Sequence, residues 1–297
     1  MSLKASSKSD LDIVLTAMAA ETGLRAALGE VLSAVPLAGL SNRVFRVETR
    51  QGAFVLRLPH EESDGLVDRT VEFANLRQAA VLGLAPEPIY SNHTSGVLLT
   101  GAVEVNAWEA GVPDPAELGG VLRCLHLSGN EFKGYRDPRA WVEVLVTPLD
   151  LNQATKRRIS SLVTCLNDPA LADVWTGRSY VPSHWDITLS NCLTGPDGLV
   201  LIDWEFSAMG PRAWDLAYAS LEIGYDDDQQ IALLAAYGAG EEQDRLVREV
   251  QIMKVWCDVI STLWALGQAL KGNPATDFEA FAKIRLERAE THLKALA

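Results

Sequence analysis

The sequence has few cysteines and no metal-binding arrangement of them. Its 4 cysteines are Cys124, Cys165, Cys192 and Cys257, and no two of them form a CxxC pair. A zinc site or a disulfide framework usually requires closely spaced cysteines or a recognisable cysteine pattern. We therefore expect neither, and we predict that the four thiols are free and buried.

Long apolar runs are also missing. No stretch reaches about 18 consecutive apolar residues, the length that a membrane-spanning helix needs, and the first residues lack a basic segment followed by an apolar one. We therefore expect no membrane insertion, and we predict a cytoplasmic protein.

Basic residues are scarce relative to acidic ones. The chain carries 26 Lys and Arg against 39 Asp and Glu, which gives a formal net charge of -13. Nonspecific nucleic-acid binding depends on clustered Lys and Arg that neutralise phosphates, so no nucleic-acid partner is expected. This excess of negative charge is compatible with a cationic substrate. A composition of 48% hydrophobic and 22% charged residues is typical of a folded globular protein, and 297 residues predict two domains or two lobes.

The N-terminal part of the sequence changes its apolar period. Helical spacing predicts one or two helices within residues 10–32. Alternating apolar residues around a Gln-Gly turn then predict a hairpin with strands at 44–49 and 53–58. A helix is expected at 67–82, where Gly and Pro follow as stop signals, and another strand at 96–100.

Helical patterns dominate the rest of the chain. They begin near Pro115 and are broken by a β-rich island at residues 180–203. We predict an α+β fold with a small β-rich N-terminal lobe, residues 1–103, and a larger, mainly helical C-terminal lobe, residues 104–297.

The stretch SHWDITLSNC has the spacing H-x-D-x-x-x-x-N, which is typical of the catalytic loop of protein-kinase-like phosphotransferases. Asp186 can accept the proton of a hydroxyl that attacks a γ-phosphate. The amide oxygen of Asn191 can bind magnesium without adding negative charge, and His184 would brace the loop.

A second stretch, LVLIDWE, predicts a buried strand that ends at a carboxylate. Magnesium favours hard oxygen ligands, so Asp203 is a candidate ligand and Glu205 can add a direct or second-sphere contact. Taken singly, either pattern also fits chance or an ordinary turn or helix cap. Their order, with a hairpin-like segment and a turn at 196–198 between them, favours the catalytic interpretation.

These residues resemble the choline/ethanolamine kinase family, in its bacterial choline-kinase-like branch, within the aminoglycoside phosphotransferase superfamily. The resembling segments span most of the chain and include GLSNRVFRVET, FVLRLP, LHLSGNEF, SHWDITLSNC, VLIDWE and MGPRAWDLA. The resemblance implies a bilobal protein-kinase-like fold with ATP between the lobes. It also implies that Asp215 supports the catalytic loop from behind.

The resemblance assigns a nucleotide role to residues of the N-terminal lobe. Arg57 corresponds to the position where protein kinases keep a lysine, and Glu72 corresponds to its ion-pair partner. Ser41 and Asn42 belong to a loop that would approach the phosphates. Without the two catalytic stretches, Arg57 and Glu72 would fit ordinary surface charges equally well.

The acceptor site is predicted from aromatic and acidic residues. The resemblance places Trp264 and Phe281 at aromatic cage positions and Glu222 at a substrate-side carboxylate. Cation–π attraction to such rings is how proteins bind quaternary ammonium groups. Trp185, inside the first motif, could also line the pocket, whereas Trp256 is expected in the core.

The sequence thus predicts an ATP- and magnesium-dependent kinase that phosphorylates the hydroxyl of a small, cationic alcohol such as choline or ethanolamine. Alternatives with the same chemistry are kinases of aminoglycosides, thiamine or homoserine. An alternative of a different class is a catalytically silent nucleotide-binding module.

Overall fold

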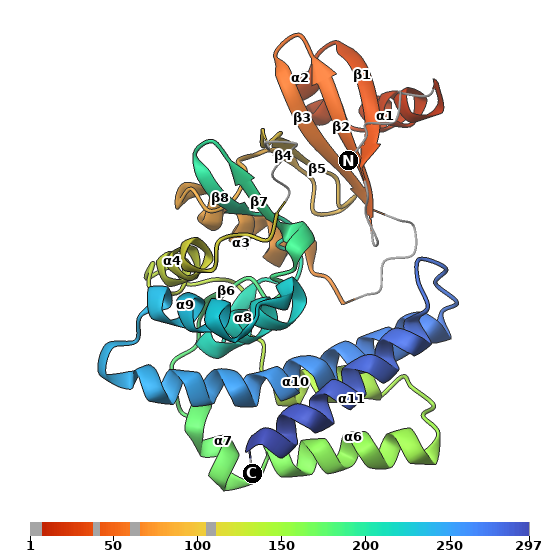
Figure 1. Ribbon diagram of the computed structural model, residues 1–297. Coiled ribbons are helices and arrows are strands. Elements are labelled where there is room, and N and C mark those ends of the chain that lie inside the picture. The colour runs from red at the N-terminus through yellow and green to blue at the C-terminus, as the bar shows by residue number, and fades with distance from the viewer. Residues whose placement is uncertain (1–7, 38–41, 60–65, 105–110, 297) are drawn as a thin grey trace. The chain divides into compact units, whose positions relative to one another are not determined.

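The computed structural model describes residues 8–37, 42–59, 66–104 and 111–296. The chain forms two compact units, one from residues 1–113 and 190–207 and the other from residues 114–189 and 208–297. The first unit holds a five-stranded sheet and the second is mainly helical, which confirms the predicted α+β class (Figure 1). The predicted domain division after residue 103 stays a prediction.

The sheet of the first unit is antiparallel, in the order β1-β2-β3-β5-β4. Its strands are β1 (Val31–Leu37), β2 (Asn42–Thr49), β3 (Gly52–Pro59), β4 (Pro88–Ser91) and β5 (Leu98–Gly101). The β2–β3 hairpin and β5 confirm the predicted strands. Strand β1 was not predicted, since Pro36 interrupts its pattern. A proline is tolerated there because β1 lies at the edge of the sheet.

Three helices accompany this sheet: α1 (Lys8–Ala20), α2 (Thr22–Leu28) and α3 (Arg69–Val81). Buried side chains of α1 and α2 pack with those of the strands in one core, which includes Leu24, Phe45, Leu56 and Leu99. Helix α3 begins at a side-chain cap, because the Asp68 carboxylate accepts hydrogen bonds from the N–H groups of residues 70 and 71. This cap fixes the turn of α3 that carries Glu72.

The second unit consists of eight α-helices and a two-stranded sheet among its described residues. The helices are α4 (Pro115–His126), α5 (Pro138–Val146), α6 (Gln153–Leu166), α7 (Pro169–Trp175), α8 (Arg212–Ala219), α9 (Asp227–Tyr237), α10 (Gln243–Leu270) and α11 (Phe278–Leu296), and the strands are β6 (Val181–Ser183) and β9 (Ala208–Gly210). Helix α10 packs against α11, α8 and α5. Trp256, in its middle, is fully buried, as predicted.

The cysteines are free, as predicted, but the expectation that all are buried was wrong. Cys257 is buried, whereas Cys124 and Cys165 are exposed. Helix α4 buries leucines at positions 118, 122 and 125, and α6 buries apolar residues at 159, 162 and 166. Each exposed cysteine lies beside the buried stripe of its helix, so its thiol faces solvent.

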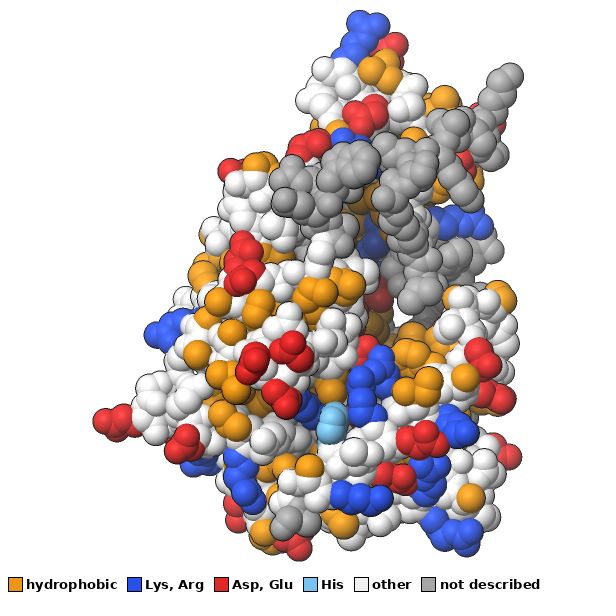
Figure 2. Space-filling model, viewed as in Figure 1, with side chains coloured by type: hydrophobic (Ala, Val, Ile, Leu, Met, Phe, Trp, Pro, Cys, Tyr) orange, Lys and Arg blue, Asp and Glu red, His pale blue; other side chains and the backbone are white. Residues whose placement is uncertain are grey.

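The described surface carries mixed charge. Over the helices of the second unit, Figure 2 shows acidic and basic side chains interspersed on the visible face. Within the described ranges, no helix is both long and apolar enough to span a membrane.

Candidate active site

A short hairpin brings the two predicted metal ligands to the same end of one structure. Strands β7 (Cys192–Gly195) and β8 (Gly198–Leu201) pair antiparallel, and the Ile202 N–H extends the pairing to the Asn191 carbonyl at 3.0 Å. This confirms the hairpin predicted between the motifs. Asn191 directly precedes β7 and Asp203 follows β8, so the backbone holds an amide and a carboxylate side chain near each other.

Each of the two motifs contains one residue with a strained backbone conformation. Among the described residues other than glycine, only Trp185 and Asp203 have positive φ angles, of 73° and 64°. Such conformations cost free energy in L-residues and cluster at functional sites, where the surrounding structure enforces them. One strained residue directly precedes Asp186, and the other is the predicted metal ligand itself.

Arg57 lies between two carboxylates of the first unit. Its Nη2 is 2.5 Å from a carboxylate oxygen of Glu72, and its Nη1 is 3.3 Å from Oδ1 of Asp203. Glu72 is 1% exposed, so its negative charge requires a paired cation. The structure thus brings together three predicted residues, one each from β3, α3 and the segment after β8, and leaves Asp203 the most exposed of them.

Arg69 is a further member of this cluster that the sequence did not single out. Its Nη1 contacts Glu72 at 2.7 Å and Glu205 at 3.1 Å, and its Nη2 donates to Asn42 at 3.3 Å. Burial lowers the pKa of Arg69, but the two carboxylates outweigh this and raise it above the ordinary value. The only sequence signal was its position three residues before Glu72, where oppositely charged helix side chains meet.

The donor set fits magnesium. Among the described residues no group of three or more His, Cys, Asp and Glu side chains is placed to hold a metal ion. Magnesium, however, is bound in kinases by one or two protein oxygens together with phosphate oxygens and water. Asp203 and Asn191 offer a carboxylate and an amide oxygen. Glu205 is less available, because its Oε2 already accepts from Arg69 and from Asn42 at 3.1 and 3.3 Å.

The catalytic loop of the second unit is anchored by Asp215. One carboxylate oxygen accepts from the His184 N–H and the other from the Trp185 N–H, each at 2.8 Å. His126 Nε2 lies 3.1 Å from Oδ2 of Asp215, and the Asp186 N–H is 3.2 Å from Nδ1 of His184. Full burial raises the pKa of Asp215, but His126 and the His184 contacts outweigh it, so the pKa lies below its usual value.

His126 was not predicted as a site residue. It lies in the segment LHLSGNEF at the end of α4, and it is 4% exposed. Its Nδ1 is 3.1 Å from the Tyr237 hydroxyl, so both ring nitrogens are engaged. His126 therefore contacts the same Asp215 oxygen, Oδ2, that accepts from the His184 N–H of the loop. A histidine inside an otherwise apolar helix end was the only available signal.

Trp185 is packed inside the second unit. It is 4% exposed, and its ring stacks on Trp214 with centroids 4.1 Å apart. Its carbonyl also accepts from the indole N–H of Trp214 at 3.1 Å. These contacts stabilise its positive φ angle. The suggested role of Trp185 in the acceptor pocket stays a prediction.

We expect Gly210→Ala to destabilise the loop, because a β-carbon at residue 210 would lie 2.4 Å from Nε1 of Trp185. The rigid, stacked indole has little room to move, so we expect a loss of about 1–3 kcal/mol in the free energy of unfolding, typical of overpacking. Urea unfolding measures it. Gly120→Ala is the control, since its β-carbon meets nothing within 4 Å. Equal stability of the two variants would contradict the packing argument.

The predicted acceptor residues lie in the second unit, but Glu222 is already paired. One of its carboxylate oxygens contacts Arg285, and the other contacts Arg288 at 3.1 Å. The ring of Trp264 meets that of Phe281 edge-on, with centroids 6.5 Å apart. The substrate-binding roles of Glu222, Trp264 and Phe281 stay predictions. Ser41 lies outside the described residues.

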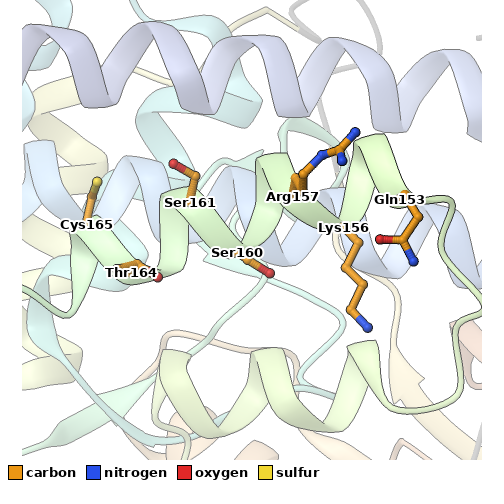
Figure 3. A pocket seen from close by; sticks show the side chains of 7 residues that line it. All are labelled: Gln153, Lys156, Arg157, Ser160, Ser161, Thr164 and Cys165. Carbon is orange, nitrogen blue, oxygen red and sulfur yellow. The ribbon is translucent and has the colours of Figure 1, made fainter.

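A surface hollow lies along α6 and holds none of these residues. It is lined by Gln153, Lys156, Arg157, Ser160, Ser161, Thr164 and Cys165. Figure 3 shows that all seven side chains come from this one helix and point in different directions. They do not converge on a common point, so we assign no chemistry to the hollow.

The chain is similar to known proteins over most of its length. The model of the phosphotransferase enzyme family (APH) matches residues 33–251. A thiamine kinase of Escherichia coli O9:H4 is 28% identical over 239 residues, which are 76% of this chain and 79% of that protein.

Solved structures of kinases share the fold. A choline/ethanolamine kinase family protein from Mesorhizobium loti is 25% identical, with a TM-score of 0.75 over 96% of this chain and 98% of its own. Choline kinase LicA from Streptococcus pneumoniae is 23% identical, with a TM-score of 0.79 over 96% and 99%. Another structure of LicA is a complex with AMP. The chain therefore belongs to the phosphotransferase enzyme family, and it is a small-molecule kinase with a kinase-like fold.

Proposed function

We propose that the protein transfers the γ-phosphate of ATP, in a magnesium-dependent reaction, to the hydroxyl of a small cationic alcohol. The observation that carries the proposal is the cluster of Arg57, Glu72 and Asp203 in the first unit. A buried cation held between carboxylates, beside a more exposed metal-ligating carboxylate, suits the binding of a magnesium-bound phosphate chain.

Each catalytic residue has a distinct task in this proposal. Asp203 and Asn191 hold magnesium, which neutralises charge on the phosphate oxygens when bound. Arg57, kept in place by Glu72, adds positive charge near the phosphates. Asp186 accepts the proton of the attacking hydroxyl, and Asp215 keeps the loop that presents Asp186 in a fixed conformation.

The names of similar proteins and the aromatic residues support the cationic acceptor. The curated relatives include thiamine kinases, and the similar structures include choline kinases. Trp264 and Phe281 could contact a cationic group through their ring faces. Choline, ethanolamine and thiamine therefore represent the acceptor class that we propose.

An acceptor panel tests the proposal. We expect magnesium-dependent ADP release to rise at least tenfold when one of choline, ethanolamine or thiamine is added, with homoserine and an aminoglycoside as comparison acceptors. A coupled assay measures ADP, and mass spectrometry identifies the phosphorylated alcohol. If no alcohol stimulates turnover while ATP binds, the silent nucleotide-binding alternative is correct. Preference for the aminoglycoside would contradict the small-alcohol assignment.

A further inference from the structure

Glu222 lies on the same continuous helical segment as Asp215, the residue that anchors the catalytic loop. Helix α8 passes directly into a π-helical turn, Ser220–Gly224, and such turns are frequent at functional sites. Asp215 anchors the loop near the start of this segment, and Glu222 follows seven residues later, roughly 10 Å along the axis at 1.5 Å per residue. The segment therefore connects the residue that anchors the Asp186 loop with Glu222.

Tyr218 connects the two positions. It lies between Asp215 and Glu222 in the sequence, and its ring stacks on Trp214 with centroids 5.9 Å apart. Burial raises the pKa of Tyr218 well above its usual value, and the nearby charges of Asp186 and Glu222 raise it further. Both carboxylates thus lie near the same phenol, so a small alcohol that presents its hydroxyl to Asp186 could extend toward Glu222.

Arg285 places a cation where a cationic substrate group would be expected. Its guanidinium carbon is 4.5 Å from the ring centroid of Phe281, and its Nη2 pairs with the carboxylate of Glu222. A cation over an aromatic ring beside a carboxylate is the arrangement that binds a quaternary ammonium group. Here the protein supplies that cation from its own helix α11.

The charges around Glu222 are balanced without a ligand. Arg288 contacts the second oxygen of Glu222 at 3.1 Å and Asp258 at 2.6 Å, and Asp258 is fully buried. Two carboxylates are thus matched by the two guanidinium groups of Arg285 and Arg288. A substrate cation that displaced Arg285 would leave a largely buried guanidinium without its partner, which is unfavourable.

Arg285 also has an unused donor. Its Nε is buried and has no hydrogen-bond partner, although Nη2 of the same side chain is paired. Buried donors in folded proteins are nearly always satisfied by a protein group, a bound water or a ligand. An oxygen or nitrogen acceptor atom of a substrate would satisfy this N–H, whereas a trimethylammonium group offers no such atom.

We infer that Arg285 is a specificity residue that selects alcohols carrying a hydrogen-bond-accepting group away from the hydroxyl, and that it disfavours alcohols ending in a quaternary ammonium group. The inference rests on the proposed function and narrows its acceptor class. Among suitable probes, thiamine offers the ring nitrogens of its pyrimidine. Choline offers no acceptor atom besides its hydroxyl.

Two variants separate the charge of Arg285 from its Nε donor, and a third variant is the control. Arg285→Gln removes the cation over Phe281, and Arg285→Lys keeps a cation but lacks the Nε donor. Arg158→Gln is the matched control, because it removes an ion pair to Glu290 of the same helix α11 without touching Glu222. Thermal unfolding of each variant verifies that it is folded.

The measurement is kcat/KM for thiamine and choline, together with calorimetric binding of each in the presence of magnesium and a nonhydrolysable ATP analogue. In the wild type we expect kcat/KM for thiamine to exceed that for choline at least tenfold. Arg285→Gln should reduce this ratio at least tenfold and raise kcat/KM for choline. Arg285→Lys should lower kcat/KM for thiamine, while kcat/KM for choline stays low. Arg158→Gln should keep the wild-type ratio.

Two results would overturn the inference. One is a wild-type preference for choline in turnover or binding, and the other is an unchanged ratio in a folded Arg285→Gln variant. These results differ from failure of the proposed function, which would show as no alcohol-stimulated ATP turnover at all. In that case the binding measurement still decides, because equal or absent binding of thiamine and choline contradicts a selective Arg285.

Discussion

Asp186→Asn is expected to lower kcat for phosphate transfer by about 10²–10⁴-fold, the range that a positioned general base contributes. The amide has the same shape as the carboxylate but cannot accept the proton of the attacking hydroxyl. The backbone N–H of residue 186 would still donate to His184, so the loop should keep its conformation. Steady-state kinetics with the preferred alcohol measures the effect.

Nucleotide binding should survive this substitution. The contacts of Arg57 with Glu72 and Asp203 do not involve Asp186. We therefore expect the Kd for a magnesium-bound ATP analogue to change less than threefold in calorimetry. Asp173→Asn, which removes an exposed carboxylate from α7, provides a control of equal charge change. A kcat loss below tenfold would show that Asp186 is not the base, and a large rise in Kd would indicate a binding role instead.

The secondary structure around the candidate site could be predicted where short sequence patterns determine it. The H-x-D-x-x-x-x-N spacing, the apolar strand before Asp203 and the Pro-Asp-Gly turn are local patterns, and the structure confirms the hairpin that joins them. The β2–β3 hairpin was predictable for the same reason, because alternation and a Gln-Gly turn determine its register. Strand β1 was missed because Pro36 interrupts its pattern, and its pairing with β2 is not visible in the local sequence.

The residues that sequence reasoning missed act through long-range contacts. Arg69 reaches Glu205, which lies 136 residues away in the chain, and His126 reaches Asp215 across 89 residues. Neither Arg69 nor His126 shows this distant partner in a local sequence pattern. Glu222 was noted from the sequence, but its partners were not. Its two arginine partners lie on a helix more than sixty residues later.

Asp215→Ala is expected to reduce the free energy of unfolding by about 3–5 kcal/mol, as removal of one partner from a buried ionic network does. The loss has two sources. The N–H groups of His184 and Trp185 would lose their acceptor, and His126 would lose the carboxylate beside its Nε2. Urea unfolding at neutral pH measures the change, and Asp173→Asn should stay within about 0.5 kcal/mol of wild type.

The pH dependence gives an independent test of the same residue. The folded-state pKa of Asp215 is lowered, so its carboxylate stabilises the fold at pH values above the unfolded pKa of about 3.9. This contribution is lost as the pH falls below that value through the folded pKa. We therefore expect wild-type stability to fall more steeply below about pH 4 than that of Asp215→Asn, which has no carboxylate to protonate. Parallel pH profiles would show that Asp215 is not the buried anion of the loop. The same variant should also lose most of its kcat, because an amide has one accepting oxygen and cannot accept from both the His184 and the Trp185 N–H groups. These contacts hold the strained conformation of Trp185, next to Asp186.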